Sequence, residues 1–173
     1  MQLLKLQIKD AHQTLESTVE DIKSEQLHQD PGGKALPLGA AYAHLVFSED
    51  KIVNGMIQQK PSLSETTYKE KTGASAPMPA MDEKWSVNHE DWANTVQIDL
   101  PKLKEYAQAV YAQTDAYLGS LTDADLDREI DLGPWGKKTI AYLIYGLVIG
   151  HANSLAGEIS AVKGVFGEKG YPF

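Results

Sequence analysis

Residues 138–163 read KTIAYLIYGLVIGHANSLAGEISAVK and form the most apolar run of the chain. No formally charged residue occurs between Thr139 and Asn153, so a helix here carries no charge for about four turns. We therefore expect this helix to be buried on most sides, together with His151 in its middle. The uncharged run spans about 15 residues, fewer than the roughly 20 that a membrane-spanning helix needs, which favours a core helix.

The composition is typical of one globular domain, which we place at residues 1–173. The net charge is −8 and Arg128 is the one arginine, so no basic surface for nucleic acid is expected. The lack of cysteine excludes a disulfide framework and a cysteine nucleophile. The first residues lack the apolar core of a signal peptide, and we expect a soluble, cytoplasmic protein without a membrane partner.

Apolar residues at three- and four-residue steps predict two amphipathic helices in the first part of the chain. The first covers about 20 residues from the N-terminus, and His12 falls within its apolar stripe. The second begins at Pro37, which suits a first helical turn, and runs to about Gln59. His44 lies at the edge of the second apolar stripe among small residues, which leaves space beside its imidazole.

Residues 61–98 break the helical pattern with several prolines and glycines, and the expected apolar anchors are Met81, Trp85, Val87 and Trp92. Loops of this length in compact domains are usually functional or disordered, and the two tryptophans favour packing over disorder, so we expect a long ordered loop here. Asp99 then predicts the N-cap of a third helix. With the helix of residues 138–163, the chain predicts an all-α, four-helix antiparallel bundle, and the long loop permits an up-down-down-up order.

Four segments in this order resemble the DinB/YfiT-like superfamily, and together they cover nearly the whole chain. They are SEQL at residues 24–27, AHLV followed by Glu49 and Asp50 at residues 43–50, LTDADLDR at residues 121–128, and HANSLAGEI at residues 151–159. The resemblance implies an up-down-down-up four-helix bundle, often a homodimer. It also implies, for many members, a divalent metal ion held by three histidines.

The resemblance assigns metal-binding roles to particular positions of this sequence. His44 matches the ligand on helix two, and His151 matches the first histidine of an H-x-x-x-H pair on helix four. Leu155 stands where the second histidine of that pair is expected, and leucine cannot coordinate zinc or nickel. His12 also faces inward and is the candidate for a replacement third ligand.

Other polar residues near these positions complete the predicted pocket. Ser48 lies one turn after His44, and Glu158 lies seven residues after His151 on the same helix face, where a carboxylate could orient a ligand or act as an acid or base. His28 and His89 fall in predicted loops, and we assign them no role.

Two functions remain open from the sequence. The first is a bundle that retains the pocket around His44 and His151 as a degenerate metal site and binds a small molecule or a partner without full metal chemistry. Leu155 favours this interpretation. The second, implied by the resemblance, is a metal-dependent transferase or isomerase that uses a low-molecular-weight thiol, whose pKa a metal ion would lower.

Overall fold

The computed structural model describes all residues 1–173, and most of the chain is helical. The helices are α1 (Gln2–Val19), α2 (Leu38–Asp50), α3 (Trp85–Thr95), α4 (Leu100–Ser120), α5 (Ile140–Tyr142) and α6 (Gly150–Val165). Two π-helical segments, η2 (Lys51–Ile57) and η6 (Leu143–Ile149), extend α2 and join α5 to α6. The strands are β1 (Glu129–Asp131) and β2 (Lys137–Thr139). Short 3₁₀ turns occupy Ser24–Gln26, Leu63–Glu65, Ala124–Asp127 and Gly133–Trp135.

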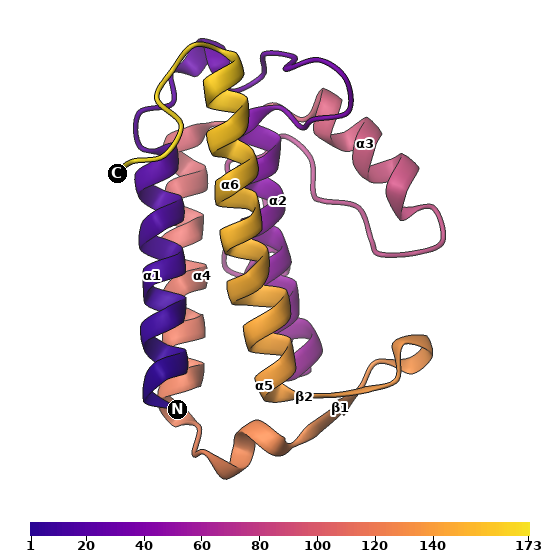
Figure 1. Ribbon diagram of the computed structural model, residues 1–173. Coiled ribbons are helices and arrows are strands. Elements are labelled where there is room, and N and C mark those ends of the chain that lie inside the picture. The colour runs from indigo at the N-terminus through magenta and orange to yellow at the C-terminus, as the bar shows by residue number, and fades with distance from the viewer.

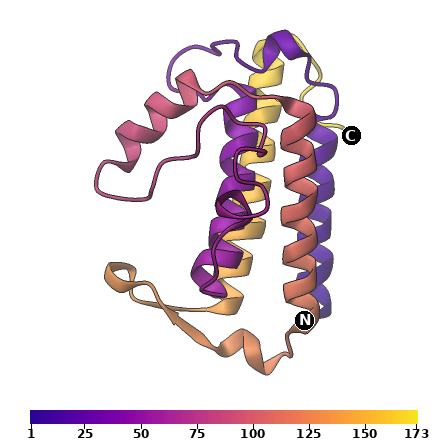
Figure 2. The ribbon, with the colours of Figure 1, turned by 180° about the vertical axis from the view of Figure 1, so that it is seen from behind.

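Four long helical segments lie side by side: α1, α2 with η2, α4, and the continuous α5–η6–α6 (Figures 1 and 2). The amino group of Met1 pairs with Asp123 at 2.8 Å, so the beginning of α1 meets the end of α4. The Lys163 ammonium donates to the Thr18 carbonyl at 2.9 Å, so the carboxyl ends of α1 and α6 meet. Helix α1 therefore runs antiparallel to α4 and parallel to α6.

The buried apolar side chains of these segments form one contiguous core. Helix α2 contributes heavily, because nearly every side chain from Leu38 to Asp50 is buried. The helix from Ile140 to Val165 is long and apolar enough to cross a membrane by length and composition alone, and here it packs on α1 and α2. Tyr142 and Tyr145 are 52% and 60% exposed, so this helix is less enclosed than the sequence predicts. Tyrosine tolerates such partly exposed positions because its hydroxyl can face water.

The carboxylate of Asp50 is fully buried and ties the segment after Pro61 to the helices. It accepts hydrogen bonds from the Tyr106 hydroxyl at 2.6 Å and from the backbone N–H groups of Leu63 and Ser64 at 2.9 and 3.0 Å. Charge-assisted hydrogen bonds of this kind are stronger than neutral ones. They fix the beginning of the long connection against both α2 and α4.

The long connection contains α3, which the sequence did not predict as a helix. In Figures 1 and 2 α3 extends away from the long helices, near the end where α2 and α4 begin. Trp92 is 6% exposed and donates its indole N–H to the Ala76 carbonyl at 3.1 Å. Trp92 is therefore an apolar anchor of this segment, as expected, whereas Met81 and Val87 are 53% and 61% exposed and are not anchors.

The segment before α5 forms a small antiparallel hairpin at the opposite end of the molecule (Figure 1). Ile130 pairs with Lys138 in its two strands, and Gly133 and Gly136 both have positive φ in the connecting turn. Glycine adopts this backbone conformation without steric cost. The expected N-cap of α4 is also observed, since the Asp99 side chain accepts the N–H of Lys102 at 3.3 Å.

Candidate functional site

His44 of α2 and His151 of α6 face each other between the two packed helices. Their Nε2 atoms lie 3.2 Å apart, and their rings meet edge to face with centroids 4.9 Å apart. Each residue is half-buried. Segment η6 ends two residues before His151, and π-helical segments often occur at functional sites because they change the direction of the side chains that follow. The structure thus brings together the two histidines that the sequence singled out.

A third histidine, His89 of α3, lies on the opposite side of the His44 ring. Its Nε2 atom is 3.0 Å from His44 Nδ1, so both ring nitrogens of His44 have an imidazole neighbour. The sequence interpretation assigned His89 no role. The spacing of Trp85, His89 and Trp92 places the three aromatic rings on one face of α3 and was the available signal, but that helix was not expected.

Aromatic and sulfur-containing side chains enclose the histidines on the side of the long connection. The Trp85 ring lies 4.6 Å from the His89 ring and 5.9 Å from the His44 ring. Met78 is 5% exposed, and its sulfur lies 3.3 Å from His44 Nδ1. The Lys51 ammonium donates to the Met78 carbonyl at 3.2 Å and holds this segment against α2.

Burial keeps all three imidazoles neutral at pH 7. Burial, together with the smaller effects of the neighbouring His151, His89 and Lys51, lowers the pKa of His44 to about 3, because a further positive charge there would be unfavourable. Burial also lowers the pKa of His151 and of His89. The unprotonated rings retain lone pairs that a metal ion could use.

The structure does not bring His12 to this cluster. His12 Nε2 lies 2.9 Å from Glu49 Oε2, and its ring stacks on Tyr111 with centroids 3.8 Å apart. The other carboxylate oxygen of Glu49 accepts the Thr114 hydroxyl at 2.6 Å. His12, the candidate third metal ligand, therefore belongs to a separate buried polar group between α1, α2 and α4, where its Nε2 is already paired with the Glu49 carboxylate.

Among the other predicted pocket residues, Leu155 is 5% exposed and belongs to the hydrophobic core. Ser48 and Glu158 are half-buried, and neither side chain makes a hydrogen bond or ion pair. No three His, Asp or Glu side chains have the geometry to hold one metal ion.

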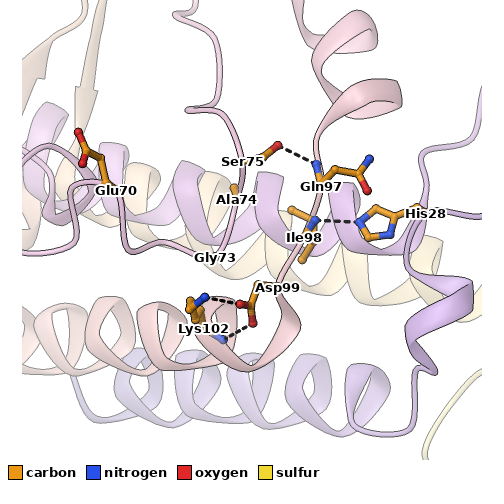
Figure 3. A pocket seen from close by; sticks show the side chains of 9 residues that line it. All are labelled: His28, Glu70, Gly73, Ala74, Ser75, Gln97, Ile98, Asp99 and Lys102. Carbon is orange, nitrogen blue, oxygen red and sulfur yellow. Dashed lines mark hydrogen bonds and ion pairs between the residues drawn. The ribbon is translucent and has the colours of Figure 1, made fainter.

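A surface pocket of about 410 Å³ lies at the beginning of α4, apart from the histidine cluster (Figure 3). His28 Nε2 accepts the N–H of Ile98 there at 2.8 Å, and Lys102 pairs with Asp99. The pocket is lined mainly by exposed polar side chains, several of which already pair with one another. We therefore interpret His28 as a structural residue that fixes the connection before α4.

These features define a class of mostly helical proteins in which histidines from two packed helices meet. The family model described as the DinB superfamily matches residues 7–154, and the chain belongs to this superfamily. The matched residues include His44, His89 and His151 and end just before Leu155.

The fold is closely similar to that of a solved crystal structure, a conserved protein from Enterococcus faecalis, with a TM-score of 0.79 over 96% of this chain and 97% of that chain. The two sequences are 19% identical, so the likeness extends to the fold alone. No curated protein matches the sequence.

Proposed function

We propose that this protein binds a divalent metal ion, zinc or nickel, through the Nε2 atoms of His44 and His151. The separation of these two atoms carries the proposal. Two imidazole nitrogens bound to a tetrahedral metal at 2.0–2.1 Å lie about 3.3 Å apart. The observed 3.2 Å matches this spacing, so the two nitrogens need little movement, and the proton of the hydrogen bond between them would move to the Nδ1 atom of its ring when a metal ion binds.

The pKa of His44 favours metal binding over proton transfer. A general base is most effective when its pKa lies near the working pH. The pKa of His44 is lowered to about 3, which makes it a weak base but leaves its lone pair free for a metal ion. The lowered pKa of His151 has the same consequence.

The two histidines would leave the other coordination positions to water or to a ligand from solution. A bound metal ion supplies Lewis acidity there and lowers the pKa of a water or thiol. Leu155 offers no third protein ligand, and we expect a lower affinity than that of a three-histidine site. In this proposal His44 and His151 hold the ion, and Trp85 and Met78 limit access of water from the side of the long connection.

We also propose that the four long segments form the up-down-down-up bundle expected from the sequence. The contacts of Met1 with Asp123 and of Lys163 with Thr18 support this order, because they fix the directions of α1, α4 and α6 relative to one another. The Tyr42 hydroxyl near the start of α2 donates to Glu16 near the end of α1, which supports an antiparallel α1 and α2.

Calorimetric titration of tag-free protein with zinc and nickel chlorides tests the metal proposal. We expect about one ion per chain for the wild type and loss of binding in His44→Ala and in His151→Ala. The matched control is His28→Gln, which changes a histidine outside the cluster. Absence of binding by the wild type, or equal binding by all variants, would contradict the proposal.

A second candidate is a metal-free bundle that binds a small molecule at the same histidines. The burial of Leu155 in the core favours it, because the third ligand position is filled by packed hydrocarbon. Thermal-shift screening in the presence of a chelator tests this candidate. Ligands that stabilise the wild type but not His151→Ala would support it, and ligand binding that requires added metal would exclude it.

A further inference from the structure

The two ring nitrogens of His44 face two different histidines, and this arrangement restricts its protonation. Nε2 lies 3.2 Å from His151 Nε2, and Nδ1 lies 3.0 Å from His89 Nε2. A neutral imidazole carries one proton, so one nitrogen donates a hydrogen bond and the other accepts. The position of that single proton decides which nitrogen of His44 has a free lone pair.

Only one of the two tautomers of His44 can bind a metal ion beside His151. When the proton is on Nδ1, His44 donates to His89 Nε2, and the Nε2 lone pair points toward His151. When the proton is on Nε2, His89 must donate to Nδ1, and the side facing His151 has no lone pair to offer. The direction of the hydrogen bond between His89 and His44 therefore decides whether His44 Nε2, the proposed ligand atom, has a free lone pair.

We propose that His89 is a positioning residue: it accepts the Nδ1 proton of His44 and so presents the His44 Nε2 lone pair toward His151. The consequence for metal binding rests on the proposed function, whereas the tautomer can be tested in metal-free protein. Histidine ligands generally donate their second N–H to a neighbouring acceptor, which fixes the tautomer and the ring orientation. Here α3 supplies that acceptor to a pair of histidines held by α2 and α6.

Met78 is the competing acceptor for the same proton. Its thioether sulfur lies 3.3 Å from His44 Nδ1, but sulfur is a weak acceptor and an imidazole nitrogen is a stronger one. His89 is also held in place, because its ring lies 4.6 Å from that of Trp85 and 5.5 Å from that of Trp92. The buried Trp92 anchors this part of α3 through its hydrogen bond to Ala76.

The tautomer can be measured in metal-free protein by long-range ¹H–¹⁵N NMR of labelled histidines. We expect His44 to be the Nδ1–H tautomer in the wild type and to shift toward Nε2–H in His89→Leu. His89→Gln should restore Nδ1–H, because its amide oxygen can accept the proton. An Nε2–H tautomer in the wild type, or a tautomer unchanged in His89→Leu, would overturn the inference.

A zinc titration of the same variants tests the consequence for metal binding. Loss of an acceptor that orients a metal-bound histidine typically weakens binding 10- to 100-fold, which we expect for His89→Leu, with recovery in His89→Gln. Asn94→Leu is the matched control, since it places the same leucine at an exposed position of α3. Failure of the wild type to bind zinc contradicts the proposed function, and the NMR result then decides the inference. Equal affinity of the wild type and His89→Leu contradicts the role of His89.

Discussion

His44 and His151 are 107 positions apart in the sequence, and their Nε2 atoms lie 3.2 Å apart in the structure. Each is half-buried at the contact between α2 and α6, where burial holds its pKa below the ordinary histidine value. This spacing is close to that of two imidazole nitrogens bound to one tetrahedral metal ion, and it is the basis of the proposed metal site. The absence of a third histidine one turn after His151 distinguishes this pair from the three-histidine pattern.

Leu155→His should restore the missing ligand, because residues 151 and 155 lie on the same face of α6. We expect the zinc affinity to rise at least about tenfold. Without metal, the buried imidazole should lower the free energy of unfolding by about 1–3 kcal/mol. Calorimetry and urea denaturation with and without zinc measure both effects. Leu155→Gln is the control, and a similar gain in affinity for this variant would show that coordination by residue 155 is not the cause.

Stability should fall in mildly acidic solution because of His44. Its pKa is near 6.5 in an unfolded chain and about 3 in the folded protein, so between these values the unfolded state binds more protons. Lowering the pH from 7 to 5 should therefore cost about 1–2 kcal/mol through His44 alone. Urea denaturation at both pH values should show a pH dependence smaller by this amount in His44→Leu. Identical pH dependence of the two proteins would contradict the assignment.

His12 should contribute to stability and not to metal binding. His12→Leu leaves the buried Glu49 carboxylate without its imidazole partner, and we expect a loss of about 3 kcal/mol or more in the free energy of unfolding. Adding Glu49→Gln should recover part of this loss, because the charge is removed while the Thr114 hydroxyl keeps an acceptor. The zinc affinity of folded His12→Leu should equal that of the wild type. A large decrease would place His12 in the metal site.

Gly73 should be sensitive to substitution because it packs directly on the beginning of α4. A Cβ atom at this position would lie 2.4 Å from the Leu103 nitrogen and 2.7 Å from the Asp99 carbonyl oxygen, and its φ is +83°. Gly73→Ala should therefore lower the free energy of unfolding by about 2 kcal/mol or more. Gly55→Ala is the matched control, since a Cβ there meets no atom within 4 Å and should be neutral or stabilising. Similar melting temperatures for the two variants would contradict this packing.

The helices could be predicted because their cause is local. The apolar stripe of α1, the proline before α2 and the N-cap residue Asp99 of α4 all act within a few residues, and the structure has each helix close to its expected range. Helix α3 was missed because prolines and glycines surround it and its exposed face gives a weak apolar pattern. Segments η2 and η6 were also missed, because a π-helical turn depends on packing between helices more than on residue type.

The site was predictable only where the resemblance marked a position. It identified His44 and His151, which the structure places together. It gave no signal for His89, which reaches His44 through a helix in the long connection. The apolar stripe placed His12 inside correctly. Burial alone does not specify a partner, however, and His12 pairs with Glu49, whereas His44 pairs with His151.

Anomalous diffraction from zinc-soaked crystals, recorded on both sides of the zinc absorption edge, tests the central claim most directly. We predict a peak about 2.0–2.1 Å from the Nε2 atoms of both His44 and His151. The peak should be lost in crystals of His151→Ala. A difference map with no zinc at this pair, or with zinc only at surface residues such as His28, would contradict the claim that the two histidines form a metal site.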